Sequence, residues 1–287
     1  MGGNLFKDLC KPITLEDAQK IVPEIIEKIK EKFPEKIILP IGSCGLKEIS
    51  SDIDIAIKTD TIKELKDIIE KVFDQSTYIM ESLYIVSIPY KYGNDKYVSV
   101  DFIQMKDIRY TYFRYKSPNY LKGGSKYKVG TKIMMVGDLL RLSPIFQQNM
   151  PENCYAWMDY SPIGLYRNIY NEKEGTYVKQ FITTDPEFIM NCIFKENGDY
   201  SDFYSVETLW KAIHEKPLIG GEEMLKNFEL SFFVNCYRKC WEEQVNPKDF
   251  NIKYWTLEEL YKEMEKQIPV RKANEFIDKM LNENPKH

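Results

Sequence analysis

The stretch from Ile37 to Lys58, IILPIGSCGLKEISSDIDIAIK, constrains the fold of this chain more than any other. It begins as a short buried strand, turns at Gly42 and Ser43, continues as a helical or looped segment, and ends in a strand that carries Asp52 and Asp54. Alternate side chains of a strand share a face, so both carboxylates point one way and the isoleucines point the other way, where helices can bury them. Two like charges so close together need a positive partner, and the hard cation Mg²⁺ prefers oxygen ligands.

A third carboxylate fits the same pattern. The sequence KYVSVDFIQ at 96–104 alternates like a strand and places Asp101 on the face opposite its apolar residues. If this strand pairs beside the first, Asp101 completes a cluster of three carboxylates. A further strand is predicted at 78–90, ended by Pro89. The glycine-serine turn supplies groups that suit a phosphate, because glycine allows close backbone approach and free amides with a serine hydroxyl at a helix start bind anions.

The chain resembles the polymerase-β-like nucleotidyltransferase superfamily over about a quarter of its length. It carries, in this order, a Gly-Ser turn, an Asp-Ile-Asp strand and a later single Asp. The resemblance implies that Asp52, Asp54 and Asp101 act in catalysis and hold two Mg²⁺ (or Mn²⁺) ions. It also implies that Gly42 and Ser43 hold the triphosphate of an NTP substrate. The implied fold is α+β, a small mixed sheet with helices on one face. One departure is the absence of Arg from the segment after the turn, where the family often has it.

Two helices are predicted to cover the isoleucine face of this sheet. The first follows Thr14 as its cap and carries apolar residues at helical spacing. Pro23 lies inside that pattern, which predicts either a kink or a start near Ile21. The second helix follows Asp60 or Thr61 as its cap.

The composition shifts between residues 91 and 141, where eleven Lys and Arg face four Asp and nine aromatic residues are interleaved. Positive charge beside aromatic rings is typical of surfaces that hold single-stranded nucleic acid or a nucleotide. A solvated, tyrosine-rich connecting surface would have the same composition. Lys126 and Lys128 are candidate nucleotide-binding residues, since KGGSK at 122–126 can cradle phosphate, although its composition equally suits a flexible loop.

The chain is predicted to divide into a nucleotidyltransferase catalytic domain at 1–129 and a mainly helical C-terminal domain at 130–287. Helices are predicted after Asp185, Ser205 and Gly221, and further helices after residue 256, whereas Pro and Gly break up 149–184. Six Cys without CxxC spacing indicate reduced thiols and a cytoplasmic protein. No apolar run approaches the ~18 residues of a membrane span, and the formal net charge is −4.

Two hypotheses about function follow. The first is an enzyme that moves a nucleoside monophosphate from an NTP to an acceptor hydroxyl and releases pyrophosphate, with Asp101 as base or metal bridge. Such transfers depend on positioning and charge neutralisation, so the scarcity of His in this chain is no obstacle. The acceptor could be an RNA or DNA end, a small molecule or a protein hydroxyl, and the basic, aromatic segment favours nucleic acid. The second is a non-catalytic nucleotide-binding or antitoxin-like regulatory module on the same fold.

Overall fold

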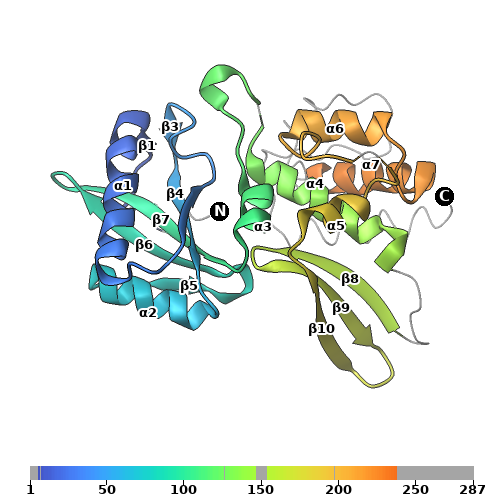
Figure 1. The fold of residues 1–287 in the computed structure, drawn as a ribbon, viewed down its shortest axis with the longest axis horizontal. Coiled ribbons are helices and arrows are strands. Elements are labelled where there is room, and N and C mark those ends of the chain that lie inside the picture. Colours follow the sequence, from blue (N-terminus) through green and yellow to red (C-terminus); the bar gives the residue numbers. More distant parts are fainter. Residues whose placement is uncertain (1–5, 7, 126, 147–153, 197, 238–287) are drawn as a thin grey trace.

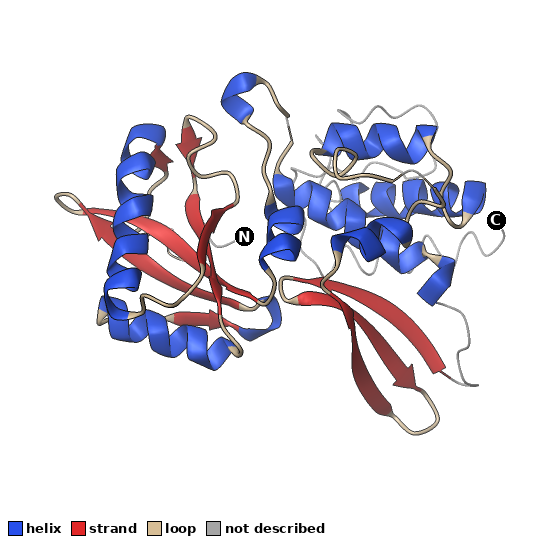
Figure 2. Cartoon of the chain, viewed as in Figure 1, coloured by secondary structure: helices blue, strands red, loops and turns tan. Residues whose placement is uncertain are grey.

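Two large β-sheets organise the chain in the computed structural model, which describes residues 6, 8–125, 127–146, 154–196 and 198–237. A third, two-stranded sheet pairs β1 (Ile13–Thr14) with β3 (Ile49–Ser50). A five-stranded sheet with helices α1 and α2 forms the N-terminal half, and a three-stranded sheet lies beside the helices of the C-terminal half (Figures 1 and 2). The five-stranded sheet has the order β2-β4-β7-β6-β5, with β2 at Ile38–Ile41, β4 at Asp52–Lys58, β7 at Lys96–Met105, β6 at Ile85–Tyr92 and β5 at Tyr78–Met80. The sheet is mixed, because β4 and β7 are parallel and the other pairs are antiparallel.

One face of this sheet is closed by α1 (Leu15–Lys32) and α2 (Ile62–Phe73). Both predicted caps are present: Thr14 accepts a hydrogen bond from the Asp17 amide at 3.2 Å, and Thr61 caps α2. Helix α1 begins at Leu15 and continues through Pro23, so the alternative start near Ile21 is wrong. The isoleucines of β4 are fully buried against these helices, which confirms the predicted alternation.

The predicted strand end at Pro89 is wrong. The region contains β5, a short 3₁₀ turn η2 (Glu81–Leu83) and then β6, which runs past Pro89 to Tyr92. Strand β5 pairs only with 85–87, so at Pro89 strand β6 has a neighbour on one side alone, β7. A proline whose nitrogen faces that open side removes no ladder hydrogen bond, which is why the strand tolerates it.

The segment that joins the halves is mostly helical. It contains α3 (Ile108–Tyr115), the turn η3 (Tyr120–Lys122) and α4 (Val129–Leu142). Tyr110 and Phe113, part of the basic, aromatic segment, are buried in the core of the C-terminal half. These two rings therefore serve packing and are not available as a stacking surface for nucleic acid.

A mainly helical C-terminal half was predicted, and this prediction is wrong over 154–183. That region forms an antiparallel sheet of order β10-β9-β8, made of β8 (Cys154–Ser161), β9 (Gly164–Asn171) and β10 (Thr176–Thr183). The glycines that seemed to break up the region belong to its hairpins: Gly175 has φ +63° in one turn, and Gly164 opens β9. The turns were visible in the sequence, but the strands between them were not recognised.

Four helices complete the described part of the C-terminal half. Besides α4 they are α5 (Pro186–Asn191), α6 (Val206–Glu215) and α7 (Gly221–Tyr237), with the 3₁₀ turn η4 (Pro144–Phe146) after α4. Asp185 and Ser205 cap α5 and α6 as predicted. Helices predicted after residue 256 lie outside the described residues. The proposed domain boundary at 129/130 coincides with the start of α4 and stays a prediction, and within the described ranges no helix has the length and apolarity needed to cross a bilayer.

Candidate active site

Three carboxylates meet on the face of the five-stranded sheet that α1 and α2 leave uncovered. Asp52 and Asp54 lie on β4, and Asp101 lies on the parallel neighbour β7. In the ladder Asp54 is directly paired with Asp101, at the ~4.8 Å separation of adjacent strands. The predicted pairing of these two strands is therefore confirmed, and it places the three side chains on one surface.

Asp101 is the most enclosed of the three. It is 2% exposed, and its Oδ1 accepts a hydrogen bond from the Ser87 hydroxyl at 2.7 Å. Ser87 lies opposite Asp101 on β6. The Ser87 hydroxyl therefore orients the buried carboxylate of Asp101. Sequence reasoning missed Ser87, although the alternation of side chains that placed Asp101 on one face of β7 could also have been applied to β6.

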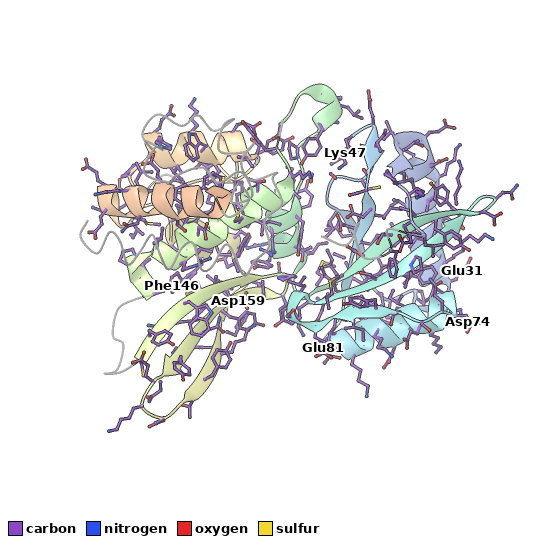
Figure 3. The ribbon with its side chains drawn as sticks, turned by 180° about the vertical axis from the view of Figure 1, so that it is seen from behind. Glu31, Lys47, Asp74, Glu81, Phe146 and Asp159 are labelled. Atoms are coloured by element: carbon purple, nitrogen blue, oxygen red, sulfur yellow. The ribbon has the colours of Figure 1, made fainter. Side chains whose placement is uncertain are left out.

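The carboxyl group of Asp54 is affected by burial and by two neighbouring like charges. Burial raises the pKa of this carboxyl well above its usual range, and the charges of Asp52 and Asp101 raise it further. Lys47, on the loop between β2 and β3 (Ile49–Ser50), lowers this pKa and is labelled in Figure 3. Lys47 is a second residue that sequence reasoning missed. Because two neighbouring like charges raise its pKa, Asp54 suits a ligand that carries positive charge.

The turn at Gly42 is built around Asp54. Gly42 has φ +71°, a left-handed conformation that favours glycine, and a Cβ there would lie 2.1 Å from Asp54 Oδ2. Only glycine therefore lets the backbone approach this carboxylate. Ser43 follows in the same turn and is half-buried. No helix begins here, because residues 42–48 form turns and bends, so the anion site at a helix start that the sequence suggested is not present.

The structure bears only partly on the two lysines that were predicted to bind nucleotide. Lys126 lies outside the described residues, and Lys128 is an exposed residue immediately before α4. The same connecting segment meets the loop after Gly42, where the Leu121 amide donates to the Leu46 carbonyl at 3.2 Å. The role of Lys128 in nucleotide binding stays a prediction.

A buried arginine connects the carboxylates with the C-terminal half. The Arg114 guanidinium is 8% exposed and lies 5.1 Å from the ring centre of Tyr115 and 4.4 Å from that of Tyr160. Among the residues that the structure describes, no hydrogen-bond partner lies within reach of its Nε and Nη1. Burial raises the pKa of the Tyr115 hydroxyl, and the charge of Asp54 adds to the rise, so Tyr115 lies within electrostatic reach of the carboxylates.

The donor chemistry of the site fits a hard divalent cation, because all three side chains are carboxylate oxygen donors. The present arrangement of these side chains is less favourable for metal binding. Among the residues that the structure describes, no three His, Cys, Asp or Glu side chains are arranged to hold a metal ion. Metal binding would therefore require the carboxylates to rotate toward a common point.

Comparisons with known proteins give no further identification. No protein-family model matches the chain, and no curated protein is similar to it. We therefore infer the function from the geometry of the site and from the sequence motif.

Proposed function

We propose that this protein is a metal-dependent nucleotidyltransferase that moves a nucleoside monophosphate from an NTP to an acceptor hydroxyl and releases pyrophosphate. The observation that carries the proposal is the in-register pairing of Asp54 with Asp101 beside a turn in which only glycine fits. This arrangement agrees with the resemblance to the polymerase-β-like superfamily. The cytoplasmic location predicted from the cysteines belongs to the same proposal.

Asp52, Asp54 and Asp101 would hold Mg²⁺ or Mn²⁺, which when bound supplies charge neutralisation at the phosphates and lowers the pKa of a hydroxyl. Asp101, oriented by Ser87, accepts the proton of the acceptor hydroxyl. The backbone of the Gly42–Ser43 turn and the Ser43 hydroxyl bind phosphate oxygens. Lys47 adds positive charge on the same side, because it already acts on Asp54.

The decisive experiment measures pyrophosphate release with each of the four NTPs, Mg²⁺ or Mn²⁺, and a panel of acceptors that includes RNA and DNA ends. Asp54→Asn keeps the shape of the side chain but removes its charge. We expect it to lower the rate by about 10³-fold or more, since metal-assisted charge stabilisation is worth several kcal/mol. Asp67→Asn, at an exposed position of α2, removes one negative charge elsewhere and serves as the matched control. Equal activity in the two variants would disprove the proposal.

The alternative is a non-catalytic nucleotide-binding or antitoxin-like module on the same fold. The observation in its favour is that the carboxylates are not already arranged around an ion in the described part of the chain. Nucleotide binding that is independent of metal, without pyrophosphate release from any NTP and acceptor, would support this alternative.

A further inference from the structure

A cavity of about 530 Å³ lies away from the carboxylates, between β8, α4 and the η2 turn of the N-terminal sheet. Ser82 and Tyr84 line it from the N-terminal half. Asp159, labelled in Figure 3, lines it from β8. Its volume falls within the range of small-molecule sites.

Two aromatic side chains line one side of this cavity. Trp157 on β8 and Tyr177 on β10 have ring centres 5.8 Å apart, with planes only 33° from parallel. Both rings are exposed, at 37% and 53%. Between their strands, buried Asn168 on β9 accepts a hydrogen bond from the Tyr177 hydroxyl at 2.5 Å, which fixes the position of that ring. A flat ring can stack on such a surface.

The charges that line the cavity are paired. Asp138 and Arg141 of α4 form an ion pair at 2.9 Å, and Asp159 and Lys179 form another at 2.7 Å. Two acids and two bases give these pairs no net charge. A polyphosphate would need an excess of positive charge, and a cationic ligand would need an excess of carboxylates. The pairs instead offer both donors and acceptors to neutral hydroxyl or amide groups.

Packed side chains separate the cavity from the carboxylates. Tyr160 lines the cavity, Arg114 stacks on Tyr160 and on Tyr115, and Tyr115 packs against Ala56 of β4 and its neighbours. A ligand in the cavity would therefore not touch the proposed catalytic groups.

We propose that this cavity is a second ligand site, which binds an uncharged, hydroxylated ring compound of the size of a nucleoside or a disaccharide. The ring stacks on Trp157 and Tyr177, and its hydroxyl groups bond to the ion pairs. The site is independent of the proposed transferase activity.

The test titrates the full chain with adenosine, cytidine, maltose and sucrose by calorimetry and tryptophan fluorescence, with AMP as a charged comparison. We expect at least one neutral compound to bind with a Kd of about 1 mM or below. Trp157→Ala should weaken that binding about tenfold or more, because stacking is lost. Phe181→Ala removes a ring of the same sheet face that does not line the cavity, and should leave binding unchanged.

Thermal unfolding of each variant is measured first. If Trp157→Ala does not fold, Tyr177→Leu at a 53% exposed position replaces it and should weaken binding in the same way. Three results would overturn the proposal: none of the four compounds binds at about 10 mM, the Trp157 and Phe181 variants lose binding equally, or AMP binds much more tightly than adenosine. Pyrophosphate release is assayed separately, so a failure here leaves the transferase proposal intact.

Discussion

The five-stranded and three-stranded sheets of this protein differ in the charges that gather on one of their faces. In the five-stranded sheet, helices bury one face completely, and the other face gathers like charges that raise the pKa of Asp54. In the three-stranded sheet, one face packs toward α4 and the other exposes aromatic rings, with Asp159 and Lys179 paired. Like charges gathered on one face predict a charged ligand, whereas ion pairs among aromatic rings predict a neutral one. The difference shows how one chain can carry sites of two chemical kinds.

The largest effect should come from the buried side of the first sheet. Ile55 is fully buried between β4 and the helices. Ile55→Ala should lower the free energy of unfolding by about 2–5 kcal/mol, through lost burial and the cavity it leaves. Urea denaturation measures the change. Phe181→Ala on the second sheet, where the ring is 53% exposed, should cost about 1 kcal/mol or less. Similar losses in both variants would contradict the proposed contrast between the sheets.

A second prediction concerns the turn beside the carboxylates. Gly42→Ala should destabilise the protein by about 3 kcal/mol and abolish pyrophosphate release, because the added Cβ meets both a left-handed backbone and the Asp54 carboxylate. Gly45→Ala is the matched control, since Gly45 has φ +78° and open space around it. It should cost only the backbone strain, about 1 kcal/mol. If the two variants behave alike in urea denaturation and in the activity assay, close contact with Asp54 is unimportant.

The free energy of unfolding should depend on pH through a lysine at the junction between the two halves. Lys132 of α4 donates to the Phe113 and Lys116 carbonyls at the end of α3, and burial lowers its pKa to about 7. Between pH 7 and its ordinary pKa of 10.5 the unfolded chain holds the proton and the folded chain loses it, so stability rises with pH. From pH 7 to 8.5 the gain should be about 1.5 kcal/mol. Urea denaturation of Lys132→Met should lack this gain; an unchanged pH profile would refute the assignment.

The smallest effect should come from the charged face itself. Without divalent metal, Asp54→Asn should raise the free energy of unfolding by about 1 kcal/mol, because it removes a half-buried charge beside two others. Added Mg²⁺ should stabilise the wild type and not the variant, since a ligand that binds only the folded state raises stability. Thermal unfolding with EDTA and with Mg²⁺ measures the effect of the substitution and the effect of the metal on stability. A variant less stable than the wild type in EDTA would show that the charge of Asp54 is already balanced.

The sequence predicted the elements whose pattern is local. The alternation in DIDIAI predicted that the carboxylates lie opposite the buried isoleucines. The capping residues Thr14, Thr61 and Ser205 predicted where their helices begin. The β8–β10 sheet was missed, since its strands carry rings on the exposed face and do not show the polar-out alternation of an ordinary half-buried strand.

The sequence by itself determined which faces of β4 and β7 would be apolar, because side-chain alternation is a property of each strand alone. Only the tertiary structure decided that Asp54 and Asp101 are paired in register, that Gly42 touches Asp54, and that Trp157 and Tyr177 form one wall. Register and contact depend on how distant segments pack, and no local pattern specifies them.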